Sequence, residues 1–387
     1  MAKSLLVDTL GRMSRPGADY SWLPDHQLHV AATLAHVDWI IDQAARLMEA
    51  YTKAGPLVLG EVVNGDRMEL VAREVAPLPA AISRLVADAL TQLRAAVEHT
   101  LFAEVEHLLD RSMSTAEEKC IEVPAFTTEE NFDKWLAHRH RRNLPPLGSG
   151  APLTGCLRRL QPYQHEDTER HPLRVLAEHT NLAKHRVPAV ATTRLGAVYP
   201  DQPHPDVAVA ISPAPGTGRS IALEAGDVLA SAPRGQQIVL NVVPTVALQR
   251  PHTGEWIVAA KELGLLEQWV RTTAVPTLIT GTAHVAPLPP QFDITTGHED
   301  LRQVLAGAGQ VAAAGRLAMR IGAAGARGSL VDLIASLRGS PDRDALQGWV
   351  DSLDDQAAVA RVNRLAENNL VAVVTLLAEA QHYAARR

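Results

Sequence analysis

The chain has 387 residues, of which 46% are hydrophobic and 21% charged, and its formal net charge is −6. One hydrophobic core rarely spans this length, so we expect a globular protein of two or three domains. The acidic balance excludes a global basic field that attracts nucleic acid, and any contact with RNA therefore requires a local patch.

Two long amphipathic helices are predicted on either side of a β-hairpin. Apolar residues recur at helical spacing over residues 26–54 and again over 82–109. Between these segments, Asn64 and Gly65 separate two alternating apolar runs, which is typical of a tight hairpin turn. A shorter helix is expected over residues 172–186, where Pro188 follows.

The pattern of apolar residues changes after this helix. Over residues 187–246 the period is two and Pro/Gly turns interrupt the runs, which predicts a compact antiparallel element of about five strands. A helix is expected over 255–280. Residues 298–387 are rich in alanine and are predicted to be all helical.

The expected fold class is therefore α+β, with three domains. An N-terminal helical bundle with an inserted β-hairpin covers residues 1–186, a small antiparallel β element with one helix covers 187–290, and an Ala-rich helical domain covers 291–387. In the last helix, apolar side chains such as Val373 and Leu377 make this tail the expected place for self-association or for a protein partner.

The N-terminal residues lack the apolar stretch of a signal peptide, since Asp8 interrupts them early. No run of about 18 uncharged apolar residues occurs in the sequence, so no membrane segment is expected. We therefore expect a cytoplasmic protein.

Arg94 and His99 form an Arg-x4-His element within the second long helix. A histidine can transfer a proton near neutral pH, and an arginine can bind a phosphate. Five helical residues turn through about 500°, so the two side chains would lie about 140° apart and flank a groove or a cleft completed by a second copy. The alternative is a salt-bridged Arg94 and a partly buried His99 that only support the fold.

The helix over 172–186 ends in a similar set of polar residues, namely Asn181, Lys184, His185 and Arg186. These residues could build a surface that faces a phosphate if their helix packs near Arg94 and His99. The alternative is that the cations complement the negative end of the helix dipole.

The densest basic cluster of the sequence contains Arg139, Arg141 and Arg142, between His138 and a Pro-rich turn. It is the best candidate for contact with an RNA backbone. The alternative is a solvated surface without a partner.

The sequence favours neither a metal nor a cofactor. Its 16 histidines do not show the paired spacing with an acid that a zinc hydrolase requires, and two cysteines cannot form a cysteine-based zinc site. A phosphate-binding loop, a Gly-x-Ser-x-Gly element and a dinucleotide fingerprint are also absent from the sequence.

The order of these elements resembles a known family. The segments 93–99, 160–163 (Leu-Gln-Pro-Tyr) and 181–186 are similar to the LRxxLDH, LQPY and NxDKHR signatures of uncharacterised bacterial proteins that are common in actinobacteria. The resemblance covers roughly residues 25–280. Glu98 and Ala183 stand where those signatures have aspartate.

The Arg-x4-His element also resembles the signature of HEPN domains, helical bundles that often act as RNA-cutting toxins or defence effectors. Ala95 follows the arginine here, where HEPN enzymes often have a polar residue. The resemblance implies a dimeric, metal-independent endoribonuclease in stress or phage defence. His99 would deprotonate the ribose 2′-OH, and Arg94 would stabilise the phosphate in the transition state.

Two other functions remain open from the sequence. One is a non-enzymatic binding or assembly protein, in which the HEPN-like helices act as a scaffold and the helical tail oligomerises. The near-neutral charge balance and the aromatic fraction of 4% favour it. The other is a small-molecule sensor that uses the β region.

Overall fold

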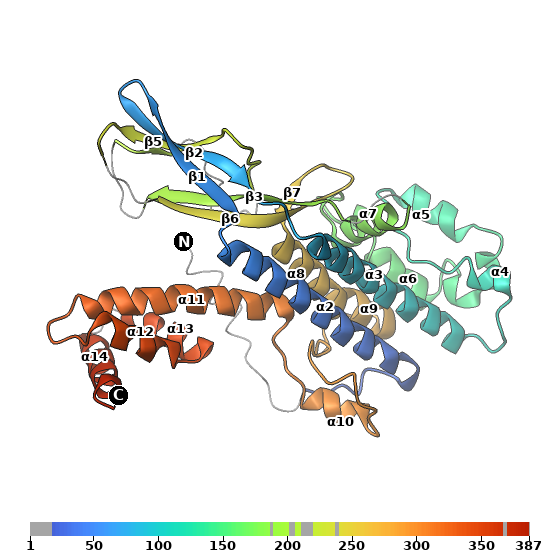
Figure 1. The fold of residues 1–387 in the computed structure, drawn as a ribbon. Helices are drawn as coiled ribbons and strands as arrows, with labels where there is room; N and C mark the ends of the chain where they lie inside the picture. Colours follow the sequence, from blue (N-terminus) through green and yellow to red (C-terminus); the bar gives the residue numbers. More distant parts are fainter. Residues whose placement is uncertain are drawn as a thin grey trace. The chain divides into compact units, whose positions relative to one another are not determined.

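The computed structural model describes residues 18–185, 189–200, 206–209, 220–236, 240–366 and 370–386. It confirms the predicted α+β class, with long N-terminal helices, antiparallel sheets and a helical C-terminal part (Figure 1). The chain forms two compact units, of which the first ends at Ala314 and the second begins at Gly315. This division differs from the three expected domains because helices on both sides of residue 187 share one hydrophobic core.

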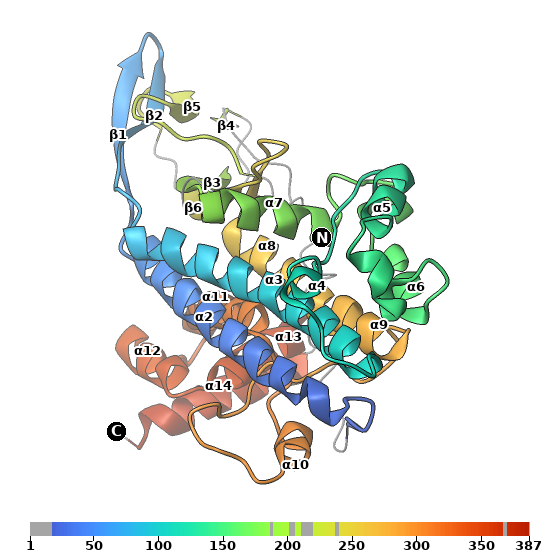
Figure 2. The same ribbon diagram turned by 90° about the vertical axis from the view of Figure 1, so that its right-hand side faces the viewer.

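The core of the first unit is built on α2 (Leu28–Lys53) and α3 (Ala80–Leu108), which pack side by side (Figure 2). Both helices lie where the apolar spacing predicted them. Their facing stripes are buried at positions such as Leu34, Ile41 and Leu93. Burial of such side chains contributes about 1.5–3 kcal/mol each, so the contact between these two helices stabilises the unit substantially.

Further helices close around this pair. They are α7 (Pro172–His185), α8 (Ala259–Trp269) and α9 (Val275–Thr280), with the π-helical turn η5 (Val270–Ala274) between the last two. Shorter elements are η1 (Asp25–Gln27), α4 (Thr115–Glu118), α5 (Glu129–Leu136), η2 (Arg141–Asn143), η3 (Pro145–Leu147), α6 (Pro152–Arg159), η4 (Pro162–Gln164) and α10 (Leu301–Ala306).

A buried guanidinium joins three separate parts of this core. Arg271, in η5, donates hydrogen bonds from Nη2 to Glu267 Oε1 at 2.8 Å and to the carbonyl oxygen of Leu34 at 2.7 Å. Its Nη1 donates to the carbonyl oxygen of Pro289 at 3.0 Å. Arg271 therefore ties α8 to α2 and to the segment that follows α9.

Two antiparallel sheets complete the first unit. One has the strand order β1-β2-β5-β4, and the other has the order β3-β6-β7. The strands are β1 (Leu57–Asn64), β2 (Arg67–Val75), β3 (Ala191–Pro200), β4 (Ala208–Val209), β5 (Val228–Pro233), β6 (Leu240–Gln249) and β7 (Trp256–Val258). The predicted hairpin is present as β1 and β2, with Gly65 at φ +62° in its turn, a conformation that glycine adopts without strain.

The hairpin is not an isolated insertion in the bundle. Its second strand pairs with β5, so residues 67–71 are hydrogen-bonded to a strand more than 150 positions later in the sequence. Ala72, Leu195, Val198 and Leu229 are buried together in one cluster that draws on both sheets. The sheets therefore pack against each other.

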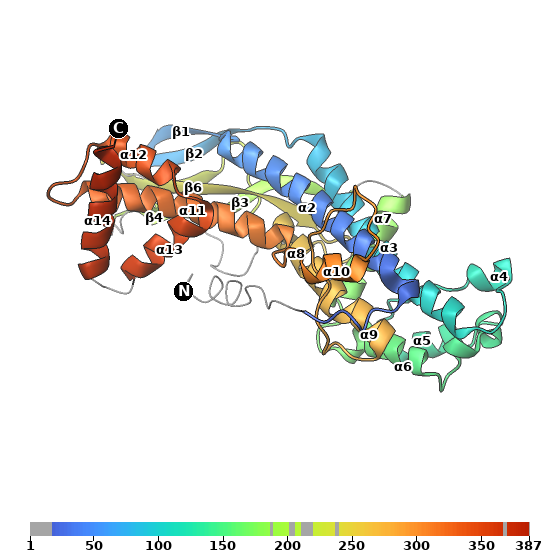
Figure 3. The same cartoon turned by 90° about the horizontal axis from the view of Figure 1, so that it is seen from below.

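The second unit is helical, as predicted for the tail. It contains most of α11 (Ala313–Ala335), followed by α12 (Arg343–Asp351), α13 (Asp355–Ala366) and α14 (Leu370–Ala384), which are visible together in Figure 3. Leu330, Ile334, Trp349 and Leu376 form its buried core. Within the described ranges of the chain, no helix combines the length and apolarity needed to cross a membrane.

We expect the replacement of Arg271 by methionine to lower the free energy of unfolding by about 3–5 kcal/mol, because it removes the cation that faces the buried Glu267 carboxylate. Lys134→Met is the control, since Lys134 pairs with Glu130 in water and should contribute less than about 1 kcal/mol. Urea denaturation followed by circular dichroism measures both changes. Equal losses in the two variants would contradict the role given to Arg271.

Candidate functional site

Arg94 points from α3 toward the segment between α4 and α5. Its Nη2 donates to the carbonyl oxygen of Val123 and pairs with Glu98 one turn along the helix. Glu98 in turn accepts a hydrogen bond from the backbone nitrogen of Val123 at 2.6 Å. Burial raises the pKa of the Glu98 carboxyl, and the Arg94 guanidinium opposes that shift. Arg94 thus fastens a loop to α3, which is the salt-bridged arrangement of the alternative interpretation.

His99 lies elsewhere on α3 and is exposed to solvent rather than partly buried. Its ring centroid is 6.5 Å from that of His29, which belongs to α2. No hydrogen bond or ion pair joins Arg94 to His99 in the described part of the chain. The structure therefore does not bring the two predicted catalytic side chains into contact.

His99 and His29 lie near a second pair of imidazoles that the sequence analysis missed. His26 stacks on His107 with 3.9 Å between ring centroids, and its Nε2 lies 2.8 Å from Glu104 Oε1. Even so, the described residues contain no group of three side chains placed to hold a metal ion.

Of the other predicted phosphate-binding residues of this group, those that the structure describes lie on α7, which packs against α3, the helix that carries Arg94 and His99. Asn181 and Lys184 are exposed on α7, and among the residues that the structure describes neither is hydrogen-bonded to the Arg-x4-His pair. The His185 side chain and the whole of Arg186 lie outside the described residues.

The basic cluster is split between the surface and the interior. Arg139 and Arg142 are exposed, whereas Arg141 is buried. The Arg141 guanidinium donates to the carbonyl oxygens of Cys120 at 2.8 Å and Trp135 at 2.7 Å, and it lies 4.0 Å from the centroid of the Trp135 ring. The prediction that Arg141 contacts an RNA backbone is therefore corrected, because its donors are engaged inside the fold.

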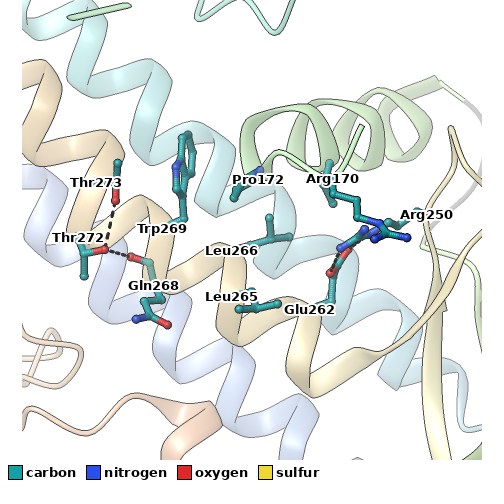
Figure 4. Close-up of a pocket in the computed structure, with 11 residues that line it drawn as sticks. Arg170, Pro172, Arg250, Glu262, Leu265, Leu266, Gln268, Trp269, Thr272 and Thr273 are labelled. Atoms are coloured by element: carbon teal, nitrogen blue, oxygen red, sulfur yellow. Dashed lines mark hydrogen bonds and ion pairs between the residues drawn. The ribbon is translucent and has the colours of Figure 1, made fainter. Parts of the chain in front are cut away.

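A pocket of about 400 Å³ opens beside α8, between α7 and η5 (Figure 4). One end is charged and is formed by Arg170, Arg250 and Glu262. The remaining wall combines apolar side chains with uncharged polar ones, namely Pro172, Val175, Leu265, Leu266, Gln268, Trp269, Thr272 and Thr273. Its lining thus changes from ionic to apolar to polar along its length.

The charged end is held in place by ion pairs. Arg250 donates two hydrogen bonds to Glu262, from Nε to Oε1 at 2.7 Å and from Nη2 to Oε2 at 2.8 Å. Both side chains are buried. Glu255, from the turn before β7, lies between two guanidiniums. It is 2.6 Å from Nη2 of Arg170 and 3.4 Å from Nη1 of Arg250. Two arginines that line the pocket therefore share one carboxylate of their own chain.

The opposite end of the pocket is shaped by η5. A π-helical turn contains one more residue than an α-helical turn, and such turns are frequent at functional sites. Here it places the consecutive residues Thr272 and Thr273 in the pocket wall beside Trp269. The Thr272 hydroxyl donates to the carbonyl oxygen of Gln268 at 2.8 Å.

Two uncharged imidazoles, those of His179 and His171, lie next to residues that line the pocket. His179 is buried with its Nε2 4.0 Å from Glu262 Oε1, and its ring nitrogens have no hydrogen-bond partner among the described residues. Burial lowers the pKa of His179 to about 3, helped by the nearby His252 and Arg250. Burial likewise lowers the pKa of His171, whose ring meets the Trp269 ring edge-on, to about 3. Both rings are therefore neutral near pH 7.

These pocket residues were not predicted from the sequence. A usable signal was Glu262, an acid on the same helical face as Ala259, Leu266 and Trp269, where only apolar residues are expected. A buried acid of this kind requires a cation, but the sequence does not show that Arg250 supplies it.

We expect His179 to make the protein less stable in acid. Its pKa is about 3 when folded and near 6.5 when unfolded, so between these values only the unfolded chain takes up the proton. Stability is therefore retained above pH 6.5 and is lost as the pH falls toward 3.

In His179→Leu, the free energy of unfolding should fall less steeply between pH 6 and pH 5, by about 1 kcal/mol per pH unit. Urea denaturation at several pH values measures the slope, with the exposed His138→Leu as control. Parallel slopes for wild type and His179→Leu would refute this explanation.

No known protein family, curated protein or solved structure matches this chain. The resemblances to the actinobacterial family and to HEPN domains therefore stay predictions. The function must be inferred from the geometry of the pocket itself.

Proposed function

We propose that this chain is a binding protein whose pocket beside α8 receives a small, elongated molecule with an acidic end group and an apolar body. The observation that carries the proposal is the carboxylate of Glu255, shared by Arg170 and Arg250. Both guanidiniums line the pocket and already bind one carboxylate, that of Glu255, which is the kind of group that an acidic ligand would offer them.

The two arginines differ in a way that suits this role. Arg250 is buried and fixed by Glu262, so its guanidinium is already oriented before a ligand arrives. The side chain of Arg170 is 51% exposed and can adjust to an incoming group. Guanidiniums bind carboxylates with paired, charge-assisted hydrogen bonds, which favours an acidic group over a neutral one at this end.

The rest of the pocket suits an apolar body of limited length. Its volume of about 400 Å³ lies in the range typical of sites for small molecules. Leu265, Leu266 and Trp269 offer apolar surface next to the charged end, and Thr272 offers a polar group beyond them (Figure 4). The charged end followed by apolar side chains suits a ligand that has an acidic group at one end and a hydrocarbon chain along most of its length.

Binding is better supported than catalysis. Glu262, the acid in the pocket wall, is neutralised by Arg250 and is therefore a poor general base. The metal-independent ribonuclease stays a prediction, since the Arg94 guanidinium is engaged by Glu98 and by the carbonyl oxygen of Val123. The pocket fits the non-enzymatic binding protein that the sequence left open as an alternative.

Titration calorimetry with octanoate and with octanol tests the proposal. We expect octanoate to bind and octanol to bind at least about tenfold more weakly, because one charge-assisted hydrogen bond contributes about 1.5–3 kcal/mol. Arg170→Gln should weaken octanoate binding by a similar factor. Arg84→Gln, which removes an exposed arginine from α3, is the matched control and should leave the affinity unchanged. Equal affinities for acid and alcohol, or no binding of either, would refute the proposal.

If Glu255 occupies the site of the acid group, its removal should strengthen binding. We expect Glu255→Gln to raise the affinity for octanoate several-fold, because the internal carboxylate no longer competes for Arg170 and Arg250. Glu166→Gln removes an exposed acid from the same region and controls for the general change in charge. If both variants bind octanoate equally well, Glu255 does not compete with the ligand.

A further inference from the structure

β1 is an edge strand of the four-stranded sheet. It pairs with β2 on one side, and no strand in the described ranges pairs with it on the other. A free strand edge offers a row of backbone N–H and carbonyl groups that another strand can bind. Proteins usually protect such edges with proline, lysine or a covering segment.

The sequence of β1 lacks these protective residues. Over Leu57–Asn64 it contains no proline and no lysine, and Glu61 is its one charged residue. Val58 is 52% exposed, Val63 50% and Leu59 37%. Because Val58 and Val63 point to opposite faces of the strand, both sides of the free edge carry exposed apolar groups.

The strand also matches itself. When two identical antiparallel strands are related by a twofold axis, the axis lies midway between the strands. One residue of the strand then faces its own copy across the axis. If that residue is Gly60, Val58 faces Val62 and Leu57 faces Val63, so apolar residues meet on both faces and residues 57–63 overlap. An axis through Glu61 would instead place two carboxylates directly opposite each other, which is destabilising.

The backbone of the hairpin agrees with this register. The two-residue turn pairs Asn64 with Arg67, and such flanking residues are hydrogen-bonded to each other. Hydrogen bonding then alternates along β1 as far as Leu59, where a bulge interrupts the pairing with β2, so Glu61 and Val63 direct their backbone groups to the free edge. A twofold axis centred on Gly60 brings outward-directed residues of the two strands together.

We propose that β1 pairs with β1 of a second copy of this chain, antiparallel and centred on Gly60, to form a continuous sheet across a homodimer. A second copy fits better than an unrelated strand because two of the three residue pairs about Gly60 join apolar residues, Leu57 with Val63 and Val58 with Val62, one pair on each face, while Leu59 faces Glu61. This surface belongs to the first unit, whereas the sequence suggested the C-terminal helices, in the second unit, for self-association.

Sedimentation equilibrium of the full chain tests the dimer. We expect Val58→Lys to raise its dissociation constant at least about tenfold, because lysine on an edge strand opposes pairing. Val374→Lys places the same charge on α14, where the side chain is 66% exposed, and should leave the dimer intact. Circular dichroism verifies that both variants are folded. A monomeric wild type, or dissociation by Val374→Lys alone, would overturn the proposal.

A distance measurement tests the register without weakening the interface. With Asn64 changed to cysteine and spin-labelled, the two copies of residue 64 should be about 27 Å apart, because eight residues of strand separate them. The native thiols Cys120 and Cys156 are buried and so protected from the label. A separation beyond about 40 Å would exclude pairing through β1.

Discussion

The buried guanidinium of Arg271 is the contact on which much of the first unit depends. It binds the Glu267 carboxylate and the backbone carbonyls of Leu34 and Pro289, so one side chain satisfies polar groups from three segments that are distant in sequence. The same π-helical turn carries Thr272 and Thr273 into the pocket wall. The Arg271–Glu267 ion pair does not line the pocket, but it holds η5 in place and so helps to determine the shape of the pocket wall.

The charged side chains at the pocket form two ion pairs, one buried and one closer to solvent. Arg250 and Glu262 neutralise each other in the interior, while Arg170 and Glu255 do so closer to solvent. Burial keeps His179 and His171 uncharged, because a protonated imidazole in this interior would lose its hydration. Such an arrangement orients donors in advance while keeping the local net charge near zero, which suits reversible binding of an acidic group.

The sequence allowed the local elements to be predicted, but not the contacts between distant ones. Helical spacing located α2 and α3, and the Asn64-Gly65 pair located the hairpin. Two contacts could not be predicted, the pairing of β2 with β5 and the ion pair of Arg250 with Glu262. Each joins residues from two separate segments, so neither produces a repeating pattern of apolar residues within one segment. The prediction for Arg94 assumed a free guanidinium, whereas Val123, from a loop, supplies its acceptor. The site was missed for the same reason, since its residues come from α7, α8, η5 and two loops and become neighbours only in the folded chain.

The basic run that ends at Arg142 shows how neighbouring residues of one type can belong to different parts of a protein. Arg141 lies inside, under the Trp135 ring, whereas Arg139 and Arg142 remain in water. Replacing all three arginines with neutral residues would therefore have two unrelated effects. It would remove the buried contacts of Arg141, and it would remove the surface charges of Arg139 and Arg142. Any phenotype of such a block substitution would reflect misfolding as much as a missing partner, and only residue-by-residue changes can separate the two.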